Sequence, residues 1–223
     1  MRKRRKARSD ATEALDDAQA EDGDGEDPTA GSAGRRVQEG PWDSGELVVE
    51  EDDETRANLG SLSVVGNPDV ELRLQVDEAS GRVDSVLLVA ADGAMELRAF
   101  AAPRNEDLWD DIRPRIASEA TRMGGTATEV DGPFGTALQL LVPGVGPDGQ
   151  QGVQPSTVFG ISGPRWLLRV STFGRPAVDY RDDGLLETTL RSVVVTRGNE
   201  PMAPGDALPL QVPSGARRID GPF

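Results

Sequence analysis

The chain has 223 residues and a formal net charge of −15, and it contains neither cysteine nor histidine. Its only lysines are Lys3 and Lys6. These absences exclude disulfide bonds, thiolate nucleophiles, histidine zinc sites, serine–histidine–aspartate triads and a Schiff-base lysine in a folded pocket. Composition therefore excludes the commonest catalytic chemistries, although it identifies no substrate.

The first 54 residues are charged and contain few aromatic side chains. Six basic residues among the first eight are followed, in residues 10–54, by seventeen acids and two arginines. Such a segment cannot bury enough apolar surface to offset the entropy lost on ordering, so we expect residues 1–54 to be disordered. The stretch GPWDSGELVVE is a possible exception, because its apolar side chains can dock on the folded part or on a partner. They are Trp42, Leu47, Val48 and Val49.

The basic tip of the chain has two interpretations. It is not followed by an apolar segment, and the longest apolar run, residues 86–91, is too short to span a membrane, so we expect a cytoplasmic protein with no membrane partner. The tip could contact phosphates, which leaves nucleic acid open as an alternative partner. We favour a solvated tail, because no basic stripe extends this footprint into the rest of the chain. The residues concerned are Arg2, Lys3, Arg4, Arg5, Lys6 and Arg8.

Three strands are predicted between residues 70 and 101. VELRLQVD alternates apolar and polar side chains, RVDSVLLVA is more continuously apolar, and AMELRAFA alternates again. EASG and ADG supply short turns between them, so an antiparallel meander is expected. The upstream stretch LGSLSVVG can add a fourth strand.

A helix is predicted for residues 105–125, NEDLWDDIRPRIASEATRMGG. Its apolar residues recur at helical spacing, and two glycines follow. Pro114 is tolerated only in a first turn, so the regular helix should start near Asp110 or Asp111; a start at Asp107 would instead predict a kink. The apolar stripe consists of Trp109, Ile112, Ile116, Ala120 and Met123.

Two hairpins, a second helix and a proline-rich tail are predicted beyond residue 125. The hairpins are TATEVD-GPFG-TALQLLV and TVFGI-SGPR-WLLRVSTF, joined by a polar loop at residues 143–155. The helix is expected over residues 177–192, weakened by Gly184. VVVTRG is then a short strand or a helix exit. Residues 198–223 form an extended tail that can lie on the domain through Leu208, Leu210 and Val212.

These elements predict an α+β fold. We expect one domain at residues 55–197, with a mostly antiparallel sheet of about seven strands, built as a meander plus two hairpins, and two packed helices. A domain of this length is large enough to bury one hydrophobic core. The flanking segments are the charged N-terminal tail and the C-terminal tail described above.

Several short motifs fail their structural requirements. GVGPDG at 144–149 matches a dinucleotide-binding pattern, but no helix follows it. Counted from the first residue of DGDGED at 22–27, the sixth and twelfth positions are not the glycine and glutamate that a calcium loop requires. FGISGP has proline where a nucleophile elbow needs glycine. Two carboxylate pairs, Asp110 with Asp111 and Glu129 with Asp131, keep a carboxylate- or metal-dependent enzyme open as an alternative.

Five residues are candidates for a contact surface, because tryptophan and arginine are enriched at binding hot spots. Trp109 also begins the apolar stripe of its helix, and Trp166 shares a strand face with Leu168 and Val170, so periodicity favours core positions for both indoles. The five candidates are Arg104, Trp109, Arg113, Arg165 and Arg169.

Several stretches resemble an uncharacterised actinobacterial family, domain of unknown function 3710. The distinctive blocks are AFAAPR, LWDDIR, GPRW and PMAPGDALPL, and the resemblance runs from about Asn58 to Pro213. Pro114 departs from the pattern. The resemblance implies a cytoplasmic single domain with a variable acidic N-terminus, and it carries no functional residues to this chain.

The sequence thus favours a non-enzymatic module that contacts an unidentified protein partner through a sheet face or edge. A nucleic-acid-associated protein and a carboxylate- or metal-dependent enzyme are the alternatives. We expect no catalytic residues, no cofactor and no metal.

Overall fold

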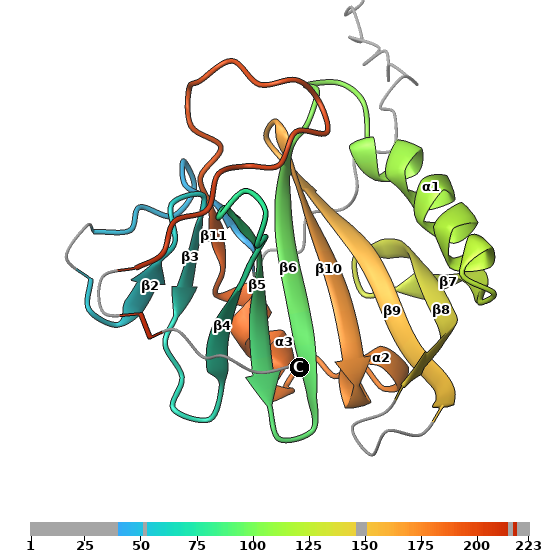
Figure 1. The fold of residues 1–223 in the computed structure, drawn as a ribbon. Helices are drawn as coiled ribbons and strands as arrows, with labels where there is room; N and C mark the ends of the chain where they lie inside the picture. The colour runs from blue at the N-terminus through green and yellow to red at the C-terminus, as the bar shows by residue number, and fades with distance from the viewer. Residues whose placement is uncertain (1–39, 51–52, 146–150, 214–215, 218–223) are drawn as a thin grey trace, which may run out of the picture. The chain divides into compact units, whose positions relative to one another are not determined.

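The computed structural model describes residues 40–50, 53–145, 151–213 and 216–217. The described residues build a seven-stranded sheet, a second sheet of four short strands, and three helices (Figure 1). The α+β class predicted from the sequence is confirmed. The sequence features within residues 1–39, including the basic tip, lie outside the described residues.

The larger sheet has the strand order β4-β5-β6-β10-β9-β8-β7, and every neighbouring pair is antiparallel. It contains the predicted meander, β4–β5–β6, and the two predicted hairpins, β7–β8 and β9–β10. The strands are β4 (Glu71–Val76), β5 (Val83–Ala90), β6 (Gly93–Ala101), β7 (Thr126–Gly132), β8 (Gly135–Val145), β9 (Gln151–Gly163) and β10 (Trp166–Gly174).

Strands β8 and β9 extend into the polar segment 143–155, which the sequence predicted to be a loop. Pro143 lies opposite Val153, and Gly144 lies opposite Gly152. The prediction was wrong here because a two-stranded ladder satisfies backbone N–H and C=O groups whatever side chains it carries. Polar, glycine-rich residues can therefore continue a hairpin beyond the hydrophobic core.

The smaller sheet has the order β1-β11-β3-β2 and brings distant parts of the chain together. Its β1 strand runs parallel to β11, with Trp42 N–H donating to the carbonyl of Val193 at 2.8 Å and Ser44 N–H to that of Val195 at 3.0 Å. Residues near Trp42 thus dock on the folded part. The strands are β1 (Trp42–Asp43), β2 (Arg56–Asn58), β3 (Leu62–Val65) and β11 (Val194–Val195).

Helix α1 (Leu108–Arg122) starts earlier than predicted. The carboxylate of Asp107 caps it by accepting from the backbone N–H of Trp109 at 3.0 Å. Pro114 consequently lies inside the helix and not in its first turn, so the start agrees with the second of the two placements that the sequence left open. The N-cap hydrogen bond and the packing of Leu108 and Trp109 offset the lost backbone hydrogen bond at the proline.

The second predicted helix is instead two short ones, α2 (Arg175–Val178) and α3 (Leu185–Arg191). The chain turns between them, where Gly184 N–H donates to the carbonyl of Arg181 at 2.9 Å. Gly184 is the N-cap residue of α3 and not an interior position, so the expected helix over residues 177–192 was wrong. No helix in the described part of the chain is long and apolar enough to cross a membrane.

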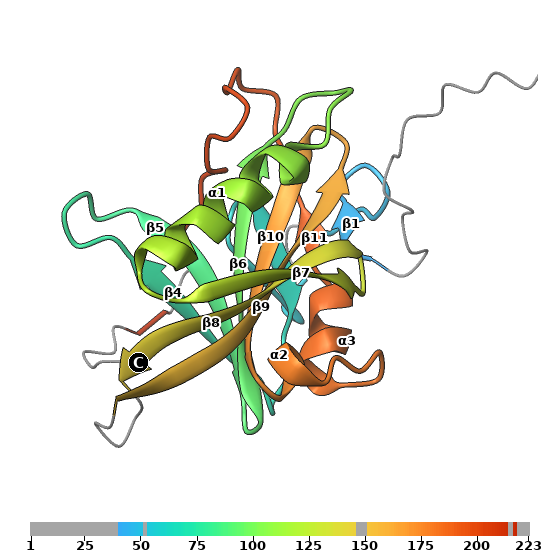
Figure 2. The same cartoon turned by 90° about the vertical axis from the view of Figure 1, so that its right-hand side faces the viewer.

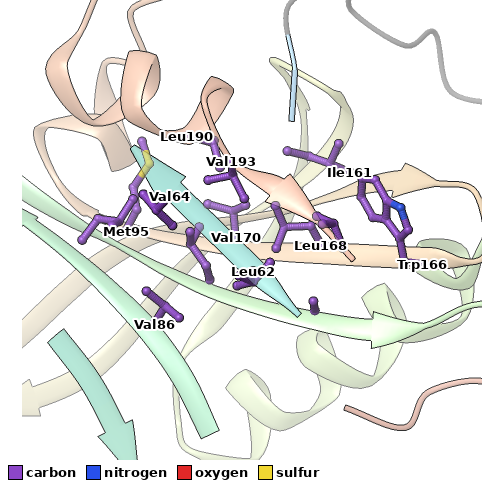
Figure 3. Packing of buried hydrophobic residues seen from close by; sticks show 14 of the residues in the cluster. Leu62, Val64, Val86, Met95, Ile161, Trp166, Leu168, Val170, Leu190 and Val193 are labelled. Atoms are coloured by element: carbon purple, nitrogen blue, oxygen red, sulfur yellow. The ribbon is translucent and has the colours of Figure 1, made fainter. Parts of the chain in front are cut away.

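One face of the larger sheet, here named the closed face, is covered by the smaller sheet and α3. Figure 2 shows these elements on the opposite side of the large sheet from α1. Alternate residues of β6 and β10, such as Met95, Leu97, Leu168 and Val170, point into this layer and are fully buried. They meet Leu190 of α3 and other apolar side chains in the main core (Figure 3).

The C-terminal segment completes this layer. Leu208 N–H donates to the carbonyl of Ala99 at 2.8 Å, and Gln211 N–H donates to that of Leu59 at 2.8 Å. Leu208 is buried in the core and Leu210 forms a bridge with Gly60. Val212 remains 58% exposed, so its expected docking was wrong. The segment therefore links the large sheet to the small one.

The other face is here named the open face, and among the described elements α1 alone covers it. A second apolar cluster lies beneath α1, built from Leu108, Trp109, Leu140, Val158 and Leu167. The remaining part of this face, over β4, β5, β6 and β10, carries the alternate set of side chains. They include Arg73, Leu87, Glu96, Arg98, Phe100, Arg169 and Ser171.

Candidate functional site

A cleft of about 200 Å³ opens at the end of the sheet where β9 turns into β10. Four segments far apart in the sequence line it: the chain entering β1, the first turn of α1, the β7–β8 turn and the β9–β10 turn. Both faces of the sheet reach this end, so the cleft has walls from both hydrophobic clusters. Its lining comes from residues 40–46, 107–113, 134–136 and 160–166.

The walls of the cleft contain two tryptophans that are held in fixed positions. The indole N–H of Trp109 donates to the carbonyl of Thr136 at 2.7 Å, and that of Trp166 donates to Oδ2 of Asp43 at 2.7 Å. Both indoles are buried, as the periodicity predicted, and each also lines the cleft. Because their hydrogen-bonding groups are satisfied within the protein and Trp109 and Trp166 are only 4% and 2% exposed, the rings are rigid supports behind the cleft surface.

Two glycines of β9 allow these rings to pack so closely. A Cβ at Gly160 would lie 2.7 Å from the ring of Trp109, and a Cβ at Gly163 would lie 2.1 Å from that of Trp166. Neither contact is possible for any residue with a side chain, unless the ring moves. The segment FGISG is therefore shaped for two indoles, a role that the sequence did not reveal.

Polar groups at the mouth of the cleft form a short network. Oδ1 of Asp107 accepts from the hydroxyl of Ser162 at 2.8 Å as well as from the α1 backbone. The guanidinium of Arg113 donates to Oε1 of Glu129 and to Oδ1 of Asp110, both at 2.8 Å. Its hydrogen bond to Glu129, followed by that to Asp110, raises the pKa of Arg113 above its ordinary value.

The charge around the cleft is acidic. Three carboxylates, Glu46, Asp107 and Asp110, line it together with one cation, Arg113. Each carboxylate already accepts a hydrogen bond, that of Glu46 coming from the N–H of Asp43 at 3.1 Å. Within the part of the chain that the structure describes, no group of three acids is placed to hold a metal ion.

The structure separates the five residues that the sequence proposed as contacts. Trp109 and Arg113 line the cleft, and Arg165 lies beside it in the β9–β10 turn with a φ of 63°. Arg104 is exposed in the connection between β6 and α1. Arg169 lies on the open face, in a different hollow. The motif DGDGED, most of GVGPDG and the basic residues Arg2, Lys3, Arg4, Arg5, Lys6 and Arg8 lie outside the described residues.

Sequence reasoning missed several lining residues. Phe134 lines the cleft and stacks on Phe159 with a centroid distance of 5.4 Å, while Ser162 and Asp107 supply its hydrogen-bonding groups. A local signal existed for Ser162 alone, which lies between the two glycines of FGISG. The convergence of these lining residues joins segments as much as 55 residues apart, which periodicity does not relate.

Comparison with known proteins gives a family but no activity. No curated protein sequence matches the chain. The solution structure of cyanobacterial PsbP (CyanoP) from Synechocystis sp. PCC 6803 is similar over 63% of this chain and 91% of that chain, with 10% sequence identity and a TM-score of 0.37. A likeness this weak carries no argument about function. The family described as "Protein of unknown function (DUF3710)" matches residues 40–218, and the chain belongs to that family.

Proposed function

We propose that this protein is a non-enzymatic interaction module whose cleft binds a segment of a partner protein. The segment we expect carries an apolar side chain next to a basic one. The observation that carries the proposal is the pair of buried tryptophans, each fixed by an indole hydrogen bond and by close contact with a glycine, at an open cleft. Rings fixed in this way pre-organise the cleft, which lowers the entropy cost of binding.

The acidic lining supports a basic ligand. Glu46, Asp107 and Asp110 outnumber Arg113, and the whole chain carries a formal charge of −15. Complementary charge accelerates encounter and disfavours acidic competitors. An apolar side chain can contact the aromatic wall near Phe134, while its basic neighbour lies close to the carboxylates at the mouth.

The chemistry of the side chains supports binding rather than turnover. The only hydroxyl that projects from the β9 segment at the cleft is that of Ser162, and it donates to a carboxylate that also caps α1. The sequence contains no imidazole or thiol to activate it. We therefore assign the cleft a recognition role.

Selection of peptides against the purified protein tests the proposal. A random peptide library would be panned on the wild-type chain and on Thr136→Arg, which adds bulk and positive charge at an exposed lining position. We expect enriched peptides to contain arginine or lysine beside an apolar residue. They should bind Thr136→Arg at least tenfold more weakly than wild type, and bind more weakly as salt increases.

The matched control is Thr128→Arg, which places the same side chain at an exposed position of β7 in the same hairpin, away from the cleft. It should bind the peptides as wild type does. The proposal is wrong if the enriched peptides lack basic residues, or if Thr136→Arg and Thr128→Arg bind them equally well.

A further inference from the structure

A second hollow, separate from the cleft, lies on the open face between α1 and strands β8, β9 and β10. It has a volume of about 300 Å³, at the lower end of the range for small-molecule sites. Most of its lining is apolar, and it includes an exposed methionine at the C-terminal end of α1, Met123, which is 53% exposed. The other apolar groups that matter here are Ile116, Leu140, Val142 and Phe173.

One cation, Arg169, lies in this apolar hollow without an acidic partner. Its Nε atom is buried and has no hydrogen-bond partner among the described residues. Its guanidinium stacks over the ring of Phe100, with Cζ 5.6 Å from the ring centroid. Burial lowers the pKa of Arg169, and Glu96 opposes this without forming an ion pair.

The other strand arginines of the open face differ in this respect. Arg73 of β4 forms an ion pair with Glu71 at 2.7 Å, and Arg98 of β6 forms one with Asp84 at 2.7 Å. A half-buried charge with no partner is unfavourable, because burial removes water that would otherwise solvate it. Arg169 is thus placed to gain from an incoming anion.

The register of the sheet strengthens this conclusion. Arg98 lies directly opposite Arg169 on the neighbouring strand, and the Nε atom of Arg98 also lacks a hydrogen-bond partner among the described residues. Like charges in directly opposed positions destabilise a sheet. An anion between the two guanidinium groups would relieve the repulsion and accept hydrogen bonds from both.

We propose that this hollow binds a small amphiphilic carboxylate, with the carboxylate at Arg169 and Arg98 and the apolar chain along Met123, Val142 and Phe173. The site is independent of the cleft and of its proposed partner. An extended peptide fits less well at Arg169, because β10 is an interior strand that pairs with β6 on one side and β9 on the other. A strand added to a free edge, the usual mode of peptide capture by a sheet, is not available at this strand.

Methionine-methyl NMR gives a site-specific test on the full chain. Among the described residues, Met123 is the methionine of the hollow, Met95 is buried in the main core, and Met202 lies in the C-terminal segment. Octanoate, titrated below its micelle concentration, should shift the methyl signal of Met123 and leave those of Met95 and Met202 in place. Octanol and octyltrimethylammonium, which share the chain but lack the carboxylate, should bind at least tenfold more weakly.

Variants test the charges one at a time. Arg169→Gln should weaken octanoate binding at least tenfold, whereas Arg115→Gln, the same change at an exposed position of α1, should not alter it. Glu96→Gln removes the neighbouring negative charge and should strengthen binding. Should Arg169→Gln fail to fold, the three ligands on the wild-type protein decide the question alone. Equal affinity for octanol, or shifts at Met95 or Met202 in place of Met123, would overturn the proposal.

Discussion

The two faces of the seven-stranded sheet are made by the same strands but are buried to different extents. On β6, the residues Met95 and Leu97 face the closed side and are fully buried, while Glu96 and Arg98 between them face the open side. A second sheet and α3 cover the first set, whereas one helix covers part of the second. The comparison shows that strand alternation sorts the side chains, and that the available covering elements decide how much of each face is buried.

The buried and half-buried charged side chains of the two faces differ in whether they have a partner of opposite charge. Glu187, on the closed side, has no exposed surface and accepts two hydrogen bonds from Arg175, at 2.8 and 2.9 Å, plus one from the N–H of Arg181 at 3.2 Å. This carboxylate, ahead of Asp92, raises the pKa of Arg175. On the open side, Arg169 has no such partner. A fully satisfied buried pair holds the closed layer together, while the unpaired cation remains available for binding.

The largest expected effect contrasts adjacent leucines of β5. Leu88 faces the closed side with 0% exposure and Leu87 faces the open side with 8%. We expect Leu88→Ala to lower the free energy of unfolding by about 3 to 4 kcal/mol, and Leu87→Ala by about 1 to 2 kcal/mol, because a cavity on the open side can collapse or fill with water. Urea unfolding measures both. Equal losses would show that the two faces are packed alike.

The next effect concerns the buried ion pair. Glu187→Gln should destabilise the protein by about 2 to 3 kcal/mol, because it leaves the partly buried Arg175 without its main partner. Asp92→Asn is the matched control, since it removes the other carboxylate of Arg175 at 2.5 Å, whose side chain is 46% exposed. That change should cost less than about 1 kcal/mol. A larger loss for Asp92→Asn would contradict the distinction drawn between them.

Tyr180 provides a pH test of the aromatic group that borders both the closed layer and the cleft. Burial raises its pKa from 10.0 to about 12, against the opposing effect of Arg191. The unfolded chain releases this proton near pH 10 and the folded chain retains it, so stability should fall by about 2 kcal/mol as pH rises from 10 to 12.

The chain contains a single tyrosine, so its ultraviolet titration reports Tyr180 alone. Tyr180→Phe keeps the ring that lies edge-on to Phe134 and Phe159, at centroid distances of 6.3 and 6.1 Å. That variant should lose the pH slope between 10 and 12. A titration midpoint at the ordinary value would mean that the ring is not held in this packed position.

The smallest expected effect is an increase, not a decrease, in the free energy of unfolding. Arg169→Met replaces the unpaired cation by an apolar side chain that also packs well on Phe100, and should raise the free energy of unfolding by about 1 kcal/mol. Arg98→Met removes an exposed ion pair with Asp84 and should change it by less than about 0.5 kcal/mol. If Arg169→Met destabilises the protein, Arg169 contributes to the stability of the fold and does not remain unpaired for the sake of ligand binding.

Local pattern predicted much of the fold. Alternation between residues 70 and 101 gave three strands in a meander, and Met95, Leu97 and Ala99, expected on one side, are all buried. Prediction from local pattern failed where backbone pairing or a turn, and not side-chain periodicity, determined the structure. Residues 143–145 and 151–155 extend a hairpin because backbone pairing does not require apolar side chains. The turn at Gly184 divides a helix that composition alone would continue.

The candidate site was less accessible to sequence reasoning. Trp109 and Arg113 were singled out and do lie at the cleft. Ser162 was considered only as a nucleophile in FGISGP and rejected, and Asp107 and Phe134 were not proposed as contacts. Arg169 was grouped with them and lies elsewhere. Tryptophan and arginine are recognisable as residue types, whereas a glycine that accepts an indole is recognisable only when its partner is known.

By itself, the sequence determined the class of fold, the order of its strands along the chain, the family, and the absence of imidazole, of thiol and of any lysine beyond position 6. Only the tertiary structure decided that β1 pairs with β11, that Trp109 and Trp166 rest on Gly160 and Gly163 at one cleft, and that Arg169 has no acidic partner. The physical reason is the separation along the sequence of the residues that interact. Side-chain periodicity acts between residues a few positions apart, whereas these contacts join segments that meet only when the sheets and helices pack.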